Sequence, residues 1–314
     1  MQKAIFCIMG PTASGKTVLA CELVRHFPFE IVSIDSAMIY REMNIGTAKP
    51  DQETLLSAPH HLIDIVNPPD SYSAARCCSD VLVCCDSIIK QGKIPLLVGG
   101  TMMYFRALQQ GLSILPEADE STRLHLFQLA QEHGWGYLHQ KLAHVDPSTA
   151  ARIHPHDTQR IQRALEVFQL TGKPLSVLLN GTANSPDRHF VNLIITPNDR
   201  AWLHERIALR FQSMLIEGLL DEVEQVIQKW ALTDDCPAMR CVGYRQAHDY
   251  LQGAYDYNTL MDKGIAATRQ LAKRQLTWLR HWPNGYHFIA ENPTNLKEMM
   301  ELIQQMLDNP RKSN

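Results

Sequence analysis

The chain has 314 residues, of which 45% are apolar and 20% are charged, and its formal net charge is -3. These values are typical of a globular protein with one large or two modest domains. No run reaches the roughly 18 apolar residues that a membrane-spanning helix needs, and the N-terminus shows neither a signal peptide nor an Arg- and Ser-rich transit segment. We therefore expect a cytoplasmic protein without a membrane partner.

The first apolar run, AIFCIM at 4–9, predicts a strand that leads straight into the stretch GPTASGKT. The helix-periodic segment VLACELVRHF follows, so the pattern G-x-x-x-x-G-K-[ST] has the strand, loop and helix context of a phosphate-binding loop. Its glycines let backbone N–H groups point inward, Lys16 adds a positive charge, and the Thr17 hydroxyl can bind Mg²⁺. The predicted ligand is a phosphate chain, which need not belong to a nucleotide. The residues assigned to it are Gly10, Pro11, Thr12, Ala13, Ser14, Gly15, Lys16 and Thr17.

Two later predicted strands end in residues suited to the same site. EIVSID at 30–35 ends in Asp35, and open α/β sheets bind their ligands at the carboxyl ends of strands. This carboxylate is a candidate magnesium ligand or general base, or alternatively an N-cap. IPLLVG at 94–99 is followed by Gly100 and Thr101, where an NTP-hydrolysing relative usually carries an acidic residue. The glycines permit close approach and the threonine offers a hydroxyl, unless they only form a tight turn.

These strands alternate with helical segments, which predicts a parallel sheet with covered faces. From about 115 to 180 the apolar residues recur at helical spacing, and the polar stretch NGTANSPDRH at 180–189 leads to a fourth strand, VNLIIT at 191–196. After 199 the chain is predicted to be helical to its end, apart from the loop CPAMRCVGYR and the turn HWPNGY. The predicted domains are an α/β core formed by 1–113 and 191–314, and an inserted all-helical domain at 114–190.

The cysteines and the histidine pair are interpreted as structural. Cys77, Cys78, Cys84 and Cys85 lie about two helical turns apart, which does not match the spacing of zinc ligands. In a reducing compartment we expect free thiols that pack as small apolar side chains. The stretch HH at 60–61 could be catalytic or metal-binding, but a structural role is favoured for histidines in loops.

Positive charge gathers in three segments: LAKRQLTWLRHW at 271–282, TQRIQR and RCVGYR. Basic residues interleaved with aromatics favour phosphate backbones and unstacked bases, so RNA is a candidate partner. A solvated helix face remains the alternative for each segment. Arg206 and Arg210 are four residues apart and share a helix face, where they could clamp an anion or form surface ion pairs.

Taken in order, these motifs resemble the bacterial tRNA dimethylallyltransferase family, also called tRNA isopentenyltransferases. The stretches that carry the resemblance, between residue 10 and about 280, are GPTASGKT, DSAMIYREMNIGTAKP, PHHLIDIVNP, YSAA, IPLLVGGTMMYFRAL, VDPSTAARIHPHDTQRIQRALEVFQLTGKPLS, RFQSMLIEGLLDEV, VGYRQ and TRQLAKRQLTWLR. The resemblance implies an α/β P-loop NTPase-like core with a parallel sheet and an inserted helical domain that binds tRNA. It also implies transfer of the dimethylallyl group from dimethylallyl diphosphate to N6 of the adenosine at tRNA position 37, with release of diphosphate.

The resemblance further implies roles for individual residues. The loop would hold the leaving diphosphate, with Mg²⁺ on Thr17, while Asp35 matches the general base and Thr101 and Arg210 match residues on the diphosphate side. The implied partners are the tRNA anticodon stem-loop and dimethylallyl diphosphate, and nothing in the sequence requires more than a monomer. The positions that match tRNA contacts are Asp35, Ser36, Ala37, Met38, Thr101, Arg123, Gln159, Arg160, Ile161, Gln162, Arg163, Arg240, Cys241, Val242, Gly243, Tyr244, Arg245, Lys273, Arg274, Gln275, Leu276, Thr277, Trp278, Leu279 and Arg280.

Two other functions stay open at this stage. A P-loop small-molecule or nucleoside kinase would place ATP in the loop and use Asp35 to activate a hydroxyl, but it leaves the helical insertion and the basic C-terminal helix without a role. A non-catalytic RNA-binding protein would explain the basic segments but not an intact Gly15, Lys16 and Thr17 beside Asp35. Prenyl transfer to tRNA accounts for both groups of residues.

Overall fold

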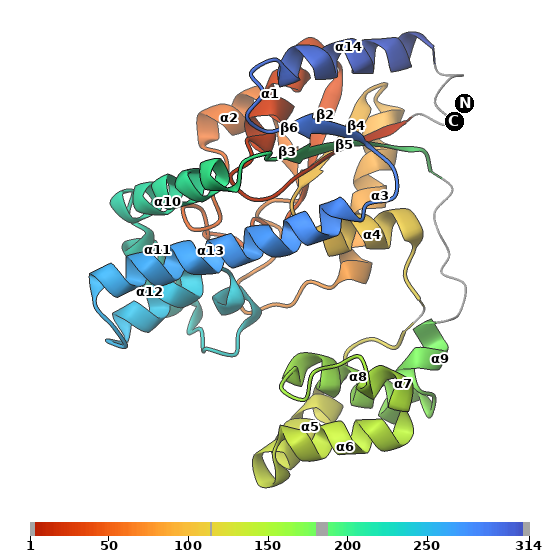
Figure 1. Ribbon diagram of the computed structural model, residues 1–314, viewed down its shortest axis with the longest axis vertical. Helices are drawn as coiled ribbons and strands as arrows, with labels where there is room; N and C mark the ends of the chain where they lie inside the picture. Colours follow the sequence, from red (N-terminus) through yellow and green to blue (C-terminus); the bar gives the residue numbers. More distant parts are fainter. Residues whose placement is uncertain (1–3, 114, 180–187, 310–314) are drawn as a thin grey trace. The chain divides into compact units, whose positions relative to one another are not determined.

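The computed structural model describes residues 4–113, 115–179 and 188–309. The chain divides into two compact units, one formed by Met1–Gln109 with Asp187–Asn314 and the other by Gln110–Pro186. The first is an α/β core and the second is built from helices (Figure 1). Most of the polar stretch that was predicted to lead into the fourth strand lies outside the described residues.

The core contains one sheet in which every described pairing is parallel, in the order β3-β2-β4-β1-β5-β6. The four central strands are buried almost throughout, so they appear in the sequence as continuous apolar runs, as expected for a parallel sheet covered on both faces. The predicted α/β class is confirmed. The strands are β1 (Ile5–Met9), β2 (Phe29–Ile34), β3 (His60–His61), β4 (Ile94–Gly99), β5 (Phe190–Thr196) and β6 (Tyr286–Ile289).

Helices account for most of the remaining core. After the fourth strand the sequence predicted a mainly helical chain. The long helix α13 is the last helix before β6, and α14 follows β6. The helices of the core are α1 (Lys16–His26), α2 (Gln52–Ser57), α3 (Ala74–Lys90), α4 (Met102–Gln110), α10 (Arg200–Ile216), α11 (Leu219–Trp230), the 3₁₀ helix η1 (Pro237–Arg240), α12 (Tyr244–Leu251), α13 (Tyr257–Arg280) and α14 (Asn295–Asp308).

Alternate residues of each central strand point to opposite layers of helices. On β1, Ile5 and Cys7 pack into an apolar cluster with α3 and α4, whereas Phe6 and Ile8 pack into a second cluster with α1 and α14. Figure 1 shows these helix pairs on opposite sides of the sheet. The two covered faces fix the strands in place, and the carboxyl ends of the strands are left to carry the loops.

Two edge strands were not predicted. β6 lies where the sequence indicated only a turn and helix, and β3 lies in a segment interpreted as loop. Phe288 is the only buried residue of β6, and β3 has just two residues, so neither presents the apolar run that marks a central strand. β6 pairs with β5 and β3 pairs with β2, both in parallel. This pairing cannot be predicted from the local sequence.

The smaller unit begins with an aspartate cap. The Asp119 side chain accepts a hydrogen bond from the Thr122 backbone N–H at 2.7 Å and so starts the first helix. The helices are α5 (Glu120–His133), α6 (Trp135–Val145), α7 (Pro147–Ala150), α8 (Thr158–Thr171) and α9 (Leu175–Leu179). Their apolar faces form a separate small core centred on Leu126, Leu138, Leu142, Ile161 and Leu165.

All eight cysteines are free thiols. Cys77 and Cys85 are buried in the core on α3, and burial raises the pKa of each thiol to about 12, so both stay neutral and pack as small apolar groups. Cys78 and Cys84 are half-buried on the same helix. Among the described helices, none is both long and apolar enough to cross a membrane.

Candidate active site

Three strand ends meet at one edge of the sheet. Gly99, the last residue of β4, pairs in register with the last residues of both β1 and β2. The loops that begin at Gly10, Asp35 and Gly100 therefore leave the sheet side by side, where parallel sheets bind their ligands. The sequence-predicted candidates from three distant segments are thus brought together by the strand order.

The loop between β1 and α1 has the backbone of an anion-binding nest. Ala13 and Gly15 have positive φ values of 63° and 87°, and Gly15 caps the N-terminus of α1. The Lys16 ammonium donates to the Pro11 carbonyl at 2.6 Å. The buried Ser14 hydroxyl has no hydrogen-bond partner within the described structure. A phosphate at this helix N-terminus would find both the helix dipole and unused donors.

Glycine is required where the backbones converge. A Cβ on Gly99 would overlap the carbonyl oxygen of Ile34, and a Cβ on Gly10 would lie 2.7 Å from the carbonyl oxygen of Ile195. In both cases the obstacle is backbone of a neighbouring strand, which cannot rotate away as a side chain can. The absence of side chains at these two positions lets the strand ends approach one another closely.

Gln275 on α13 ties two of these loops together. Its side-chain oxygen accepts from the Thr12 backbone N–H at 2.9 Å, and its side-chain NH₂ donates to the Gly100 carbonyl at 2.9 Å. Gly100 is needed for this contact because a Cβ there would overlap the Gln275 amide. In this structure the Gln275 amide fixes the phosphate-binding loop to the end of β4, and its contact with tRNA stays a prediction.

Asp35 begins a tight turn directly after β2. Its Oδ1 accepts from the backbone N–H groups of Ala37 at 2.8 Å and Met38 at 3.3 Å, which is an Asx turn. The Thr101 hydroxyl oxygen accepts from the Ser36 backbone N–H at 3.1 Å. The predicted segment 35–38 and Thr101 are therefore joined by hydrogen bonds. The Asp35 carboxylate is held by backbone N–H groups.

Two cations lie close to this carboxylate. Burial, together with the positive charge of Arg210, lowers the pKa of Lys16 to about 7, and the Asp35 carboxylate only partly opposes this. Burial also lowers the pKa of Arg210, with Asp35 again opposing. The pair therefore concentrates positive charge in a site that lacks a matching number of anions, and an anionic ligand would relieve their repulsion.

A cavity of about 150 Å³ joins these residues. The phosphate loop, the turn at Asp35 and the helices α10 and α13 all contribute to its wall. Arg206, the other member of the predicted pair, lies outside this cavity and donates from Nε to the Ala13 carbonyl at 2.9 Å, so it braces the loop. The polar residues that line the cavity are Thr12, Lys16, Thr17, Ser33, Asp35, Thr47, His60, Arg210, Thr268 and Gln275.

The histidine pair forms β3 and is held by local contacts. His60 Nδ1 lies 2.7 Å from the Ala58 carbonyl, and His61 Nε2 lies 2.9 Å from the Glu30 carboxylate. Burial lowers the pKa of His60 and so favours the neutral ring. These contacts agree with the structural interpretation, although His60 also borders the cavity.

Sequence reasoning missed Glu222 on α11. Its carboxylate accepts hydrogen bonds from three successive backbone N–H groups, those of Asn44 and Ile45 at 2.8 Å and of Gly46 at 3.0 Å, and also from the Tyr244 hydroxyl. Gly46 lines the cavity. Glu222 therefore fixes the loop that forms one wall of the cavity to the start of α12, a connection that only the folded chain makes visible.

In the smaller unit, a buried glutamate organises two candidate arginines. Glu166 has a fully buried side chain and accepts from Arg123 Nε at 2.8 Å and from Arg163 at 2.6 Å. Burial opposes ionisation of Glu166, but the hydrogen bonds from these arginines outweigh it and lower its pKa. Arg160, by contrast, is exposed and pairs with Asp157 at 2.9 Å.

The remaining positions matched to tRNA contacts separate by burial. The side chains of Ile161, Tyr244 and Leu279 are at most 1% exposed and pack in apolar cores, so they cannot reach RNA directly. This corrects their inclusion as contacts, because the basic segments are amphipathic and one face of each is internal. The surface-exposed members are Ser36, Arg123, Gln159, Arg160, Arg240, Arg245, Lys273, Arg274, Thr277, Trp278 and Arg280. The partly buried members outside the Asp35 turn are Thr101, Gln162, Arg163, Cys241, Val242, Gln275 and Leu276, while Gly243 is buried.

The fold and the site define a P-loop protein in which a carboxylate lies in the same cavity as the predicted phosphate-binding loop. Comparison with known proteins specifies the family. Residues 38–282 match the family described as IPP transferase, and 3–68 match isopentenyl transferase. The chain belongs to the tRNA dimethylallyltransferase, or tRNA isopentenyltransferase, family and is a prenyltransferase by that membership.

Individual relatives agree over nearly the whole chain. A tRNA dimethylallyltransferase of Legionella pneumophila (strain Corby) is 61% identical, covering 98% of this chain and 99% of the relative. One from Burkholderia lata is 51% identical, covering 97% and 95%. The crystal structure of a tRNA isopentenylpyrophosphate transferase from Bacillus halodurans has a TM-score of 0.72 and 34% identity, with 98% of each chain covered.

The lowered pKa of Lys16 predicts proton uptake on anion binding. At about pH 8 the ligand-free lysine, with a pKa of about 7, is mostly neutral, whereas bound diphosphate favours its charged form. Calorimetric titration of inorganic diphosphate in two buffers of different ionisation enthalpy should show uptake of close to one proton at about pH 8. At about pH 6 the lysine is already charged, so this contribution should vanish.

The matched control is Lys16→Arg, which stays charged across this range. Protonation of the diphosphate itself contributes equally to both proteins, so the difference between them reports Lys16. Equal proton counts for the two proteins at about pH 8 would contradict the lowered pKa.

Proposed function

We propose that this enzyme transfers the dimethylallyl group of dimethylallyl diphosphate to N6 of the adenosine at position 37 of tRNA. The bond between the allylic carbon and the diphosphate oxygen breaks, a bond from N6 to that carbon forms, and one N6 proton leaves. The products are N6-dimethylallyladenosine in tRNA and diphosphate. The observation that carries this proposal is that the phosphate-binding loop, Arg210 and the Asp35 carboxylate all line one cavity.

The leaving group fits the charges of the loop. As the allylic C–O bond breaks, negative charge develops on the diphosphate, and Lys16, Arg210 and the N-terminus of α1 are positioned to stabilise it. The two cations are buried before the reaction begins, so little reorganisation is needed when this charge appears. Arg206 would contribute indirectly, by holding the loop at Ala13.

The residues at the loop fit Mg²⁺. Thr17 lies in the first turn of α1 and lines the cavity together with Asp35, so oxygen donors are available. The described residues contain no cluster of three or more His, Cys, Asp or Glu that could hold a metal, so an ion at Thr17 would take most of its ligands from phosphate and water. When bound, Mg²⁺ would add positive charge beside the leaving diphosphate.

Asp35 is suited to accept the N6 proton. The exocyclic amine of adenine is a weak nucleophile because its lone pair is delocalised into the ring, so proton removal must accompany bond formation. The Asx turn holds the carboxylate through Oδ1 and fixes its direction. The target adenosine would have to leave the anticodon-loop stack to reach this group.

Recognition of the anticodon stem-loop is assigned to basic residues that are exposed or partly exposed. Lys273, Arg274 and Arg280 lie exposed on α13, and Arg123 and Arg163 are oriented by Glu166 in the smaller unit. Such side chains would contact phosphates, while Trp278 offers an exposed ring for stacking. A monomer acting in the cytoplasm, where its tRNA substrate is found, is sufficient for this function.

A direct assay separates prenyl transfer from nucleotide turnover. Purified protein is mixed with Mg²⁺, unmodified tRNA and either labelled dimethylallyl diphosphate or labelled ATP. We expect label to enter tRNA from the prenyl donor alone, with release of diphosphate and with ATP left intact. ATP turnover without prenylation would replace the proposal with a kinase.

Asp35→Asn should lower the rate of transfer by at least about a hundredfold, because general base catalysis commonly contributes that much. The asparagine side chain retains an oxygen for the Ala37 and Met38 N–H groups, so the turn and tRNA binding should be preserved. Single-turnover transfer and equilibrium tRNA binding are measured on the same preparation. Asp308→Asn on α14 is the control, and a near-normal rate for Asp35→Asn would remove Asp35 from the role of base.

Arg274→Ala should weaken tRNA binding and reduce the slope of log affinity against log salt by about one, as loss of one phosphate contact requires. Lys297→Ala removes the same charge from α14, which packs on the α1 face of the sheet, and should leave the slope unchanged. Affinity for inorganic diphosphate should be the same in both variants. An unaltered slope for Arg274→Ala would mean that this residue does not contact the RNA backbone.

A further inference from the structure

Apolar side chains form part of the cavity wall, and Phe211 is one of them. The phosphate loop and Arg210 form the charged end, whereas the neighbouring residue Phe211 contributes a buried ring to the wall. α10 supplies three of the apolar residues at helical spacing, so they form one continuous stripe beside the arginine. The larger apolar side chains that line the cavity are those of Met38, Val98, Ile207, Phe211, Met214, Val242 and Leu271.

A single face of α13 runs along the cavity from its charged end. Gln275, Leu271 and Thr268 all line it, and Gly264 follows on the same face one turn before Thr268. Gln275 contacts the phosphate loop, and the eleven residues back to Gly264 span about 16 Å of helix. Gly264 is therefore at the far end of this face from the phosphates.

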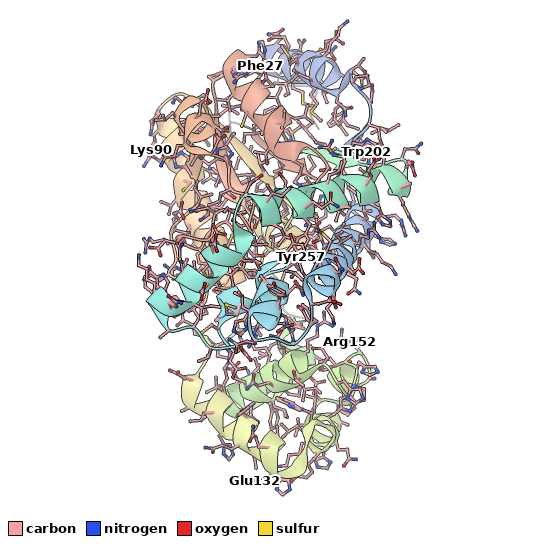
Figure 2. All side chains as sticks on the ribbon, turned by 90° about the vertical axis from the view of Figure 1, so that its left-hand side faces the viewer. Phe27, Lys90, Glu132, Arg152, Trp202 and Tyr257 are labelled. Carbon is pink, nitrogen blue, oxygen red and sulfur yellow. The ribbon has the colours of Figure 1, made fainter. Side chains whose placement is uncertain are left out.

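Phe211 rests directly on Gly264. A Cβ at this glycine would overlap the Cζ atom of the ring and would lie 2.6 Å from its Cε2 atom. Figure 2 shows α10 and α13 crossing, with Trp202 and Tyr257 marking their first turns, and both helices belong to the same packed unit. The ring can occupy this position only because residue 264 has no side chain, and the backbone of α13 behind it prevents any further retreat.

We propose that Phe211, seated on Gly264, closes the apolar end of the cavity and restricts the donor to a five-carbon allylic chain, excluding ten-carbon allylic diphosphates. This inference rests on the proposed function, since it assigns the apolar end to the prenyl chain. The diphosphate oxygens would lie at Lys16 and Arg210, and the chain would extend from them along the apolar stripe of α10.

The size of the cavity favours the shorter chain. Its volume of about 150 Å³ includes the charged end as well as the apolar wall, so only part of it is available to the prenyl chain. An apolar cavity of about 150 Å³ accommodates a ligand no larger than about the size of benzene. A five-carbon group is of that size, whereas five further carbons need space that the Phe211 ring fills. Steric exclusion of this kind can discriminate more strongly than a missing methylene, which changes specificity by about 10- to 200-fold.

Phe211→Ala should open this end of the cavity. The experiment measures kcat/KM for transfer to tRNA from dimethylallyl diphosphate and from geranyl diphosphate, its ten-carbon homologue. With either donor the allylic C–O bond breaks, the N6–C bond forms and diphosphate leaves. We expect the geranyl to dimethylallyl ratio to rise at least about tenfold over that of the wild type. An unchanged ratio in the folded variant would overturn the proposal.

Gly264→Ala tests the other side of the same contact. The added methyl group should push the ring into the cavity and raise the KM for dimethylallyl diphosphate by about tenfold, while the affinity for inorganic diphosphate, which lacks the chain, stays unchanged. The double variant Phe211→Ala with Gly264→Ala should recover the KM, because the smaller side chain leaves room for the new methyl group. A wild-type KM for folded Gly264→Ala would contradict the packing argument.

Two control variants distinguish a general loss of packing from a specific effect on the closed end of the cavity. Phe105→Ala removes an equally buried ring that does not line the cavity, and it should leave the donor ratio unchanged. Gly136→Ala adds a methyl group to a helical glycine with nothing within 4 Å, and it should leave the KM unchanged. If Phe211→Ala does not fold, Phe211→Leu replaces it with the same expected direction of change.

The outcomes also distinguish this inference from the proposed function. If the wild-type enzyme transfers no dimethylallyl group to tRNA, the proposed function fails and the donor ratio is undefined. If the wild type transfers that group and the Phe211 and Gly264 variants behave as it does, only the assignment of the apolar end is wrong.

Discussion

The site depends on the close approach of main chains at the carboxyl edge of the sheet. Gly99 touches the backbone of Ile34, and Gly10 that of Ile195, with no room for a side chain at either glycine. This packing places the phosphate loop, the Asp35 turn and Thr101 within one small region. The sheet therefore positions Asp35 and Thr101, whereas helix α10 contributes Arg210 and part of the apolar wall.

Charge and burial oppose each other in this site. Lys16 and Arg210 are removed from water next to one another, with Asp35 as the nearby opposite charge, and such an arrangement lowers the stability of the ligand-free protein. The same arrangement stabilises a bound anion more strongly than exposed lysine and arginine would, because little solvent screens it. Glu222 and Glu166 differ from this pair of cations, because each carboxylate accepts several hydrogen bonds from the protein itself and needs no ligand to stabilise its charge.

Local sequence was sufficient for the central strands and the phosphate loop, because continuous apolar runs and the glycine spacing report backbone requirements directly. It was not sufficient for β6, whose single buried residue leaves no pattern. The contacts of Gln275 with Thr12, of Glu222 with Asn44 and of Phe211 with Gly264 join residues 53 or more positions apart, so only the packed chain reveals them. Burial also shows which members of the basic segments face inward, as Tyr244 and Leu279 do.

The two faces of α13 have different freedom to change during evolution. On the inward face, Thr268, Leu271 and Gln275 line the cavity, and Gly264 packs against the ring of Phe211, which also lines it. The outward face bears Lys273, Arg274 and Thr277, which are exposed to solvent. The proposed function assigns this outer face to tRNA. On that assignment, substitutions there would change the choice of RNA without disturbing the chemistry, so one helix would let the substrate range diversify while the reaction itself is kept.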